Sequence, residues 1–177
     1  MEKTKTENLV FDGKLLKFYN DEVTLENGDT SKREYVKHPG GVCCLAIKNG
    51  MIYFEKQFRY PFRNEILELP AGKIEKNEDP KDAIIRELEE EIGFIPKTIE
   101  FIDYMYPSVG YTNEIIYLYF SPINDETESH LEIDEFLSVK PIPIKEAYSM
   151  LDKNEIHDAK TVYLMLKLRQ RIFDEYI

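Results

Sequence analysis

Hydrophobic and polar positions alternate with the spacing of strands along much of the first 70 residues. The clearest case is the apolar run over residues 42–47, which Asn49-Gly50 separates from a second run over residues 51–58. An Asn-Gly pair suits the tight turn of a β-hairpin, and an uninterrupted apolar run suits a strand that is buried on both faces. We therefore expect a hairpin at the centre of a sheet.

Shorter strand candidates lie on both sides of this hairpin. They are residues 9–11, 15–20, 22–25, 65–69, 98–105, 114–120 and 135–140. Turn-forming residues separate them, including Asp12-Gly13 after the first and Pro70-Ala71-Gly72 before a long polar stretch. The pattern predicts a sheet of many short strands.

The best-marked helix follows Asp79. Asp79 can cap the helix, Pro80 suits its first position, and Gly93 can end it in the left-handed conformation. Apolar residues recur between them with helical spacing, at Ala83, Ile84, Leu88 and Ile92. Two more helices are expected over residues 144–151 and 158–173. The order strands, helix, strands, helices predicts an α/β (α+β) fold with a mixed sheet between helices.

Composition limits the class of protein. The 177 residues suit one domain with a small appendage, and a net charge of −11 argues against binding to nucleic acid. We find no apolar run of the roughly 20 residues that span a membrane, and the N-terminus lacks the apolar centre of a signal peptide, so we expect a cytoplasmic protein. The adjacent Cys43 and Cys44 are expected to be buried, reduced thiols.

The negative charge is concentrated in two segments. Residues 65–94 carry a net charge of −6, residues 125–135 carry another −6, and the rest of the chain carries +1. Within the first segment Glu87, Glu90 and Glu91 lie on one face of the predicted helix, where their mutual repulsion is destabilising. Such a face is either solvated or neutralised by a cation, and carboxylate oxygens alone suit Mg²⁺ or Mn²⁺.

The segment as a whole matches a longer pattern. Gly72 is followed after five residues by Glu78, and after seven more by the run Arg86-Glu87-Leu88-x-Glu90-Glu91-x-Gly93-Phe94. This spacing resembles the Nudix hydrolase signature. The neighbouring segments 57–61, 65–74, 106–114 and 134–139 resemble the ADP-ribose pyrophosphatase subgroup.

The resemblance implies a fold, a reaction and a metal. It implies a Nudix domain over residues 41–177, preceded by a strand segment over residues 1–40 that serves as a dimerisation arm. The reaction would be Mg²⁺-dependent hydrolysis of ADP-ribose to AMP and ribose 5-phosphate, with Mn²⁺ as a possible substitute. The metal ligands would be Glu87 and Glu91, with Glu90 and the carbonyl of Ala71 as additional ones.

The resemblance also implies roles for nearby residues. Arg86 would pair with Glu78 and orient the loop beside the metal ligands. Glu135 would be the general base that takes a proton from water, with Glu132 and Asp134 as alternatives in the same acidic run. The other interpretation of that run is a solvated loop.

Substrate contacts are expected from Arg59 and Glu68, with Ser108 and Gly110 shaping a substrate loop. The chain has no Trp to stack on adenine, so the candidates for that contact are Phe18, Tyr19 and Tyr35, each of which also fits an ordinary strand position. The three histidines, His38, His130 and His157, match no metal-binding spacing and are interpreted as incidental.

Two alternatives to ADP-ribose hydrolysis stay open. The enzyme could act on another nucleoside diphosphate sugar such as GDP-mannose, or the chain could sense ADP-ribose without cleaving it. The resemblance implies a homodimer with a small-molecule substrate, and neither nucleic acid nor membrane is an expected partner.

Overall fold

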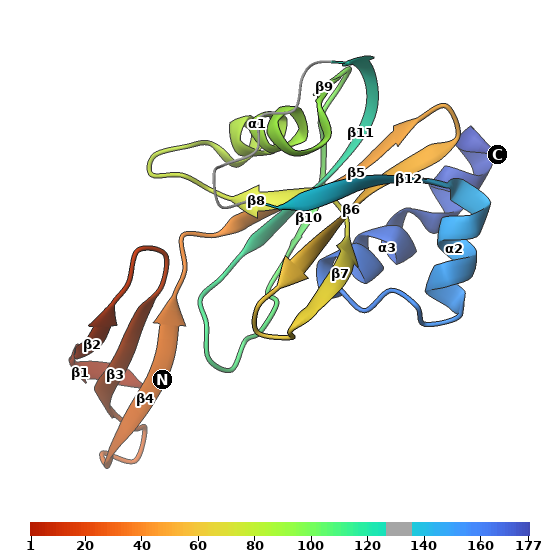
Figure 1. Cartoon of the computed structure of the whole chain (residues 1–177). Coiled ribbons are helices and arrows are strands. Elements are labelled where there is room, and N and C mark those ends of the chain that lie inside the picture. The colour runs from red at the N-terminus through yellow and green to blue at the C-terminus, as the bar shows by residue number, and fades with distance from the viewer. Residues whose placement is uncertain (127–135) are drawn as a thin grey trace. The chain divides into compact units, whose positions relative to one another are not determined.

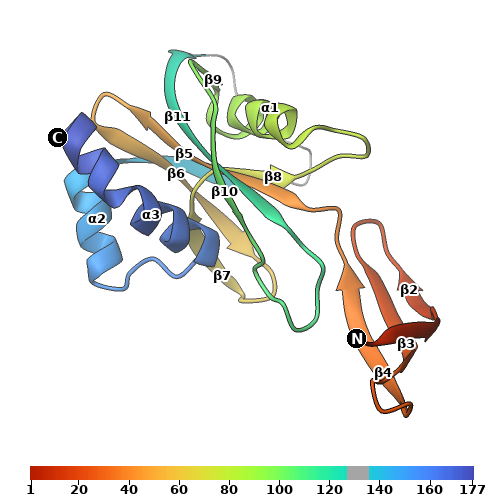
Figure 2. The same ribbon diagram turned by 180° about the vertical axis from the view of Figure 1, so that it is seen from behind.

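The computed structural model describes residues 1–126 and 136–177, and it divides the chain into two compact units. Unit 1 comprises Met1–Gly40 and Tyr106–Ile115, and unit 2 comprises Gly41–Met105 and Ile116–Ile177. Both units are drawn in Figure 1 and, from behind, in Figure 2. Across the described residues, no helix is long and apolar enough to cross a membrane.

Unit 1 is an antiparallel sheet built around one central strand. Its strands are β1 (Lys3–Thr6), β2 (Leu9–Asp12), β3 (Lys17–Thr24) and β4 (Thr30–Lys37). The strand β3 pairs with all three others, so the expected break between residues 20 and 22 is wrong. The strands β1 and β4 were not predicted, because they are largely exposed and polar and lack an apolar alternation.

Unit 2 contains an eight-stranded mixed sheet. Its strands are β5 (Gly41–Lys48), β6 (Met51–Arg59), β7 (Asn64–Glu68), β8 (Ala71–Lys73), β9 (Phe94–Pro96), β10 (Glu100–Met105), β11 (Ile116–Glu126) and β12 (Leu137–Pro143). The order β10-β11-β5-β6-β12 forms its main path, with β7 on β6, β8 on β5 and β9 on β11. The strands β11 and β5 run parallel, whereas the other pairs are antiparallel. The predicted hairpin at the centre of the sheet is confirmed.

Three helices cover the two faces of this sheet (Figure 1). They are α1 (Pro80–Ile92), α2 (Ile144–Asp152) and α3 (Ala159–Tyr176). The helix α1 packs on one face, where Val42, Cys44 and Ala46 of β5 meet it, and α2 and α3 pack on the other. Alternate residues of β5 thus pack into the two hydrophobic cores, one on each face of the sheet. The prediction of a mixed sheet between helices is confirmed.

Local signals explain why α1 begins and ends where it does. The Asp79 side chain accepts a hydrogen bond from the backbone N–H of Lys81 at 2.8 Å, and Pro80 occupies the first turn. At the other end Gly93 has φ 69° and ψ 37°, a left-handed conformation that ends the helix. The four predicted apolar positions of this helix are all buried.

The short strand β8 was not predicted, and it matters for the site. The expectation at Pro70-Ala71-Gly72 was a turn before a polar stretch, but Ala71 and Gly72 belong to β8, which pairs with residues 41–43 of β5. A three-residue strand gives too short a pattern to be recognised in the sequence. Its pairing fixes the backbone of Ala71 and Gly72 against the sheet, beside α1.

Candidate active site

The acidic residues of α1 do not form a solvated face. Glu87 and Glu91 are only 5% and 3% exposed, while the neighbouring Glu90 is half-buried. A carboxylate in the protein interior is costly unless it is paired or hydrogen-bonded. The solvated interpretation is therefore wrong for Glu87 and Glu91, and it is their compensating partners that define the site.

Arg86 connects three of the carboxylates. Its Nη1 donates to Glu87 Oε1 and to Glu90 Oε2, each at 2.8 Å. Its other edge forms a fork with Glu78, from Nε to Oε1 at 2.9 Å and from Nη2 to Oε2 at 3.1 Å. Bidentate pairs of this kind are the strong ones, and the Glu78 bonds are the main cause that lowers the pKa of that carboxyl and raises the pKa of Arg86. Arg86 thereby ties α1 to the loop that precedes it.

Gly72 makes room for Glu87. A Cβ atom at Gly72 would lie 1.9 Å from Glu87 Cδ and 1.9 Å from its Oε1, a distance at which something must shift. The next residue back, Ala71, donates its backbone N–H to Glu91 Oε2 at 3.1 Å. The backbone of β8 thus lies directly against both buried carboxylates of α1.

This donor set fits a hard divalent cation. The groups that could hold it are the carboxylates of Glu87, Glu90 and Glu91 and the backbone of Ala71, all of which supply oxygen. Within residues 1–126 and 136–177 no three acidic, histidine or cysteine side chains are already gathered as a formed metal site. Arg86 Nη1 donates to both Glu87 and Glu90.

A hollow of about 420 Å³ opens on the outer side of α1. Asp82, Ile85, Arg86, Glu89 and Glu90 line it. Its walls therefore include Arg86, whose Nη1 donates to the buried Glu87, and Glu90, which accepts a hydrogen bond from the same Nη1.

Glu55 is a buried carboxyl that the sequence analysis did not identify. It lies on β6, is fully buried, and neither of its oxygens receives a hydrogen bond from a described N–H or O–H group. It lies across from Glu68 in the strand pairing and within hydrogen-bonding reach of the Glu91 carboxyl. Burial raises its pKa to about 8, and the charge of Glu68 adds to this rise. At neutral pH Glu55 is therefore mostly protonated.

Glu55→Gln should remove a pH-dependent loss of stability. The folded state binds a proton on Glu55 up to a pKa of about 8, whereas the ordinary value is 4.5. Between these values the folded state holds more protons than the unfolded state, so stability falls as pH rises, by at most about 1.4 kcal/mol per pH unit. Urea unfolding of both proteins at pH 6 and pH 8 should show the wild type losing roughly 2 kcal/mol relative to the variant. An equal difference at both pH values would contradict this account of Glu55.

Two of the predicted substrate residues are paired with each other. Arg59 donates from Nε to Glu68 Oε1 at 2.6 Å and from Nη2 to Glu68 Oε2 at 2.9 Å. The Glu68 side chain is 4% exposed, whereas that of Arg59 is 37% exposed. Of the two, Arg59 is the residue that solvent or a ligand can reach.

The remaining predicted residues belong to unit 1 or fall outside the described part of the chain. Ser108 and Gly110 belong to unit 1, and no atom would lie within 4 Å of a Cβ added to Gly110. Glu132, Asp134 and Glu135 fall outside the described residues, as does His130. Tyr19 and Tyr35 stack on each other at 5.2 Å between ring centroids, and the Lys37 ammonium lies 4.2 Å from the ring centroid of Tyr19. These roles stay predictions.

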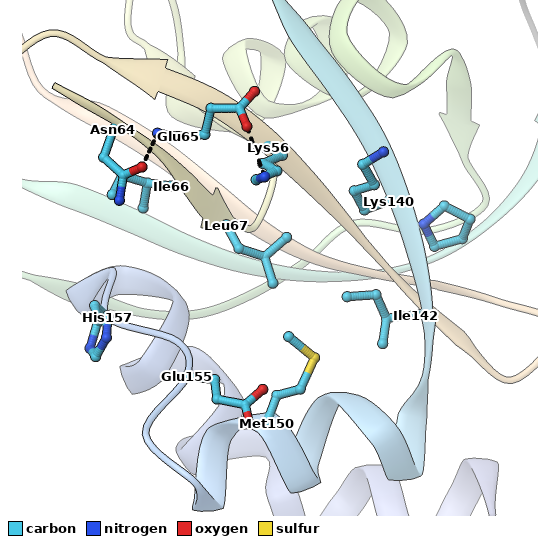
Figure 3. A pocket seen from close by; sticks show the side chains of 11 residues that line it. Lys56, Asn64, Glu65, Ile66, Leu67, Lys140, Ile142, Met150, Glu155 and His157 are labelled. Atoms are coloured by element: carbon cyan, nitrogen blue, oxygen red, sulfur yellow. Dashed lines mark hydrogen bonds and ion pairs between the residues drawn. The ribbon is translucent and has the colours of Figure 1, made fainter.

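A separate hollow of about 560 Å³ lies on the side of the sheet that carries α2 and α3 (Figure 3). Leu67, Ile142 and Met150 form its apolar part, and Lys56 at its edge pairs with Glu65 at 2.8 Å. His157 also lines this hollow, between α2 and α3. None of the predicted site residues lines it, so we do not assign it to the chemistry of α1.

The sequence contained signals for the residues that were missed. Glu55 directly follows the apolar residues 51–54 of the predicted central strand, and a charged residue at such a position indicates a paired or neutralised group. Lys160 follows the helix cap Asp158 in the first turn of α3, where a cation is normally disfavoured. Neither signal identifies the partner that is distant in sequence, which is Glu91 for Glu55 and Glu68 for Lys160.

Comparison with known proteins finds a family model, relatives and a solved structure that are similar to this chain. The NUDIX domain family model matches residues 37–165. The ADP-ribose pyrophosphatase of Bacillus subtilis is 40% identical over 171 residues, which cover 95% of this chain and 92% of the relative. A methanol dehydrogenase activator of Bacillus methanolicus is 40% identical over 173 residues, or 94% of each chain. A solved structure of an ADP compounds hydrolase has a TM-score of 0.84 and 16% identity, over 98% of this chain and 95% of the other, a likeness of fold.

Proposed function

Because this chain belongs to the Nudix hydrolase family, we propose that it hydrolyses the diphosphate bond of ADP-ribose and releases AMP and ribose 5-phosphate. The observation that carries the proposal is the pair of buried carboxylates, Glu87 and Glu91, set against the backbone of β8. The similarity to the ADP-ribose pyrophosphatase of Bacillus subtilis supports ADP-ribose as the substrate.

The proposed reaction needs Mg²⁺ or a similar divalent cation. When bound, such a cation neutralises the diphosphate and lowers the pKa of the attacking water. Glu87 and Glu91 would be its main ligands, with Glu90 and the carbonyl of Ala71 as additional ones. Arg86 holds the carboxylates of Glu87 and Glu90 in place from one side.

Two further roles complete the proposal. Glu135 would accept the proton of the attacking water, with Glu132 and Asp134 as alternatives in the same acidic run. Arg59 would bind a phosphate of the substrate, since its side chain is 37% exposed and a planar fork suits such a group. Ser108 and Gly110 would contribute to the substrate loop.

A panel of substrates tests the proposal. We expect Mg²⁺-dependent turnover of ADP-ribose to exceed that of GDP-mannose, NADH and diadenosine polyphosphates. A preference for GDP-mannose would keep the nucleoside diphosphate sugar class but replace the substrate. The absence of turnover with all four would contradict hydrolysis and favour a protein that only senses ADP-ribose.

A second candidate function comes from a relative at the same identity. The Bacillus methanolicus relative is an activator of methanol dehydrogenase, and its similarity covers 94% of this chain. The corresponding experiment adds the chain to methanol dehydrogenase and measures dehydrogenase activity. An increase with the wild type that is lost in Glu91→Gln would favour this function and place it at the same site.

We also propose that the protein works in the cytoplasm, where Cys43 and Cys44 stay reduced.

We further propose that two copies associate through unit 1, with residues 1–40 as the dimerisation arm. Support for the arm comes from large apolar side chains of unit 1 that are 42–64% exposed, namely Leu9, Val10, Phe11, Leu15 and Leu16. Light scattering should give the mass of two chains, about twice 20.9 kDa, and Phe11→Glu should shift it toward one. A wild type of one-chain mass would contradict the dimer.

A further inference from the structure

The helix α3 carries a buried lysine in an unfavourable place. Lys160 is the second residue of α3, directly after the cap Asp158 and the first residue Ala159. The N-terminus of a helix carries partial positive charge, so a cation in its first turn is disfavoured. The Lys160 side chain is nevertheless only 11% exposed. Such a charge needs compensation from nearby anions.

Two carboxylates supply that compensation. The Lys160 ammonium donates to Glu68 Oε2 at 2.5 Å and lies 3.0 Å from Asp158 Oδ2. Burial by itself would lower the pKa of Lys160, but the charges of Asp158 and Glu68 raise it above its ordinary value. The lysine is therefore charged at neutral pH, and it is held between the helix cap and β7.

Glu68 transmits this contact to Arg59. Its Oε2 accepts from Lys160 Nζ and from Arg59 Nη2, while its Oε1 accepts from Arg59 Nε. The buried carboxylate is thus held from two sides by two cations. This cluster has two acidic side chains, those of Glu68 and Asp158. It also has two basic ones, those of Arg59 and Lys160, so the charges of the cluster cancel. A balanced buried group has one favourable arrangement, which restricts where the Arg59 guanidinium can lie.

The contacts of Arg59 with Glu68 leave its Nη1 group available to a ligand. Its Nε and Nη2 face Glu68, whereas no described residue accepts a hydrogen bond from its Nη1. Arg59 has the same parity along β6 as Tyr53, whose ring packs against Phe94 in the core on the α1 side. The partly exposed side chain of Arg59 therefore belongs to the face of the sheet that carries Glu87 and Glu91.

We propose that Lys160 is a positioning residue for substrate binding, which holds Glu68 so that Arg59 presents its Nη1 group to a phosphate of the nucleoside diphosphate sugar. This inference rests on the proposed function. It assigns α3, on the opposite face of the sheet, a part in the site on the α1 side. Lys160 touches neither the substrate nor the reacting atoms, and its effect passes through Glu68 and Arg59.

The first experiment measures KM and kcat for ADP-ribose with Lys160→Met. We expect KM to rise about tenfold while kcat stays within about twofold, because a binding contact is lost and the metal ligands are untouched. Lys160→Arg keeps the charge and should restore KM to within about threefold of the wild type. The matched control is Lys167→Met on the same helix, whose exposed ammonium pairs with Asp103 and which should change neither constant.

A double-mutant cycle decides whether Lys160 acts through Arg59. In an Arg59→Ala background, Lys160→Met should change KM by less than about twofold, because the residue it positions is already gone. Effects that multiply in the double variant would overturn the proposal, as would an equal fall of kcat in Lys160→Met. If Lys160→Met does not fold, Glu68→Gln replaces it in the same cycle with the same expectation.

The test separates this inference from the proposed function. If the wild type cleaves no nucleoside diphosphate sugar, the proposed function fails, and the cycle is measured instead with the dissociation constant of ADP by calorimetry. Non-additive losses of ADP affinity would still support the positioning role. Additive losses, or none, would overturn it.

Discussion

Glu91→Gln lowers kcat for ADP-ribose by at least about 10²-fold while the fold is kept. Loss of a group that only supports a metal ligand already costs about 10–100-fold in affinity or activity, so loss of a ligand charge should cost more. The glutamine oxygen can still accept the bond from the Ala71 N–H, which preserves the local structure. The same result is expected for Glu87→Gln. Steady-state kinetics and circular dichroism on the purified variants check both statements.

The matched control for these variants is Glu146→Gln. Glu146 is an exposed acid in the first turn of α2, so the same chemical change there should leave kcat within about twofold. Near-normal turnover in Glu91→Gln, with excess Mg²⁺ present, would show that the buried carboxylates of α1 are not the metal ligands.

Gly72→Ala should remove activity with little loss of stability. The added Cβ would lie 1.9 Å from Glu87 Cδ and Oε1, so the carboxylate must leave its position. Because it is the end of a flexible side chain, its displacement should cost only about 1–2 kcal/mol of stability. A shift of about 1 Å in a catalytic group can cost about 10²-fold in rate. We therefore expect a fall in kcat of that size, measured beside urea unfolding.

The double variant Gly72→Ala with Glu87→Gln identifies the route of this effect. If the alanine acts by displacing Glu87, the double variant should be no slower than the slower single variant. A multiplied loss would mean that Gly72 acts through another group. Unchanged turnover in Gly72→Ala would contradict the close contact between β8 and α1.

The parts of the fold that could be predicted from the sequence are those set by local chemistry. The helix α1 was predicted because Asp79, Pro80 and Gly93 mark its ends and its apolar positions recur with helical spacing. The strand β4 was missed because it is half-exposed and polar. The strand β8 was missed because its three residues are held by pairing with β5, a contact that no local pattern records.

The same division applies to the site. Spacing alone placed Glu87, Glu90 and Glu91 on one face of a helix. It did not show that Glu87 and Glu91 are buried, since that depends on packing against the sheet and on the room left by Gly72. Of the partners of Arg86, Glu78 was expected from the resemblance to the Nudix family, whereas the bonds to Glu87 and Glu90 were not predicted.

Contacts between residues that are far apart in the sequence could not be predicted. Lys160 meets Glu68 over 92 positions, and Glu55 meets Glu91 from a different element. No periodicity links residues so far apart, so their pairing follows only from the fold. The concentration of negative charge in residues 65–94 indicated a segment that needs neutralisation, but it did not indicate that Arg59 and Lys160 pair with Glu68 there.

The most direct test of metal-assisted diphosphate hydrolysis is the rate of AMP formation from ADP-ribose by the wild type, with Mg²⁺ and with EDTA. We predict AMP and ribose 5-phosphate in equal amounts with Mg²⁺, loss of turnover with EDTA, and recovery when Mg²⁺ is restored. Turnover that persists in EDTA, or products other than AMP and ribose 5-phosphate, would contradict the account.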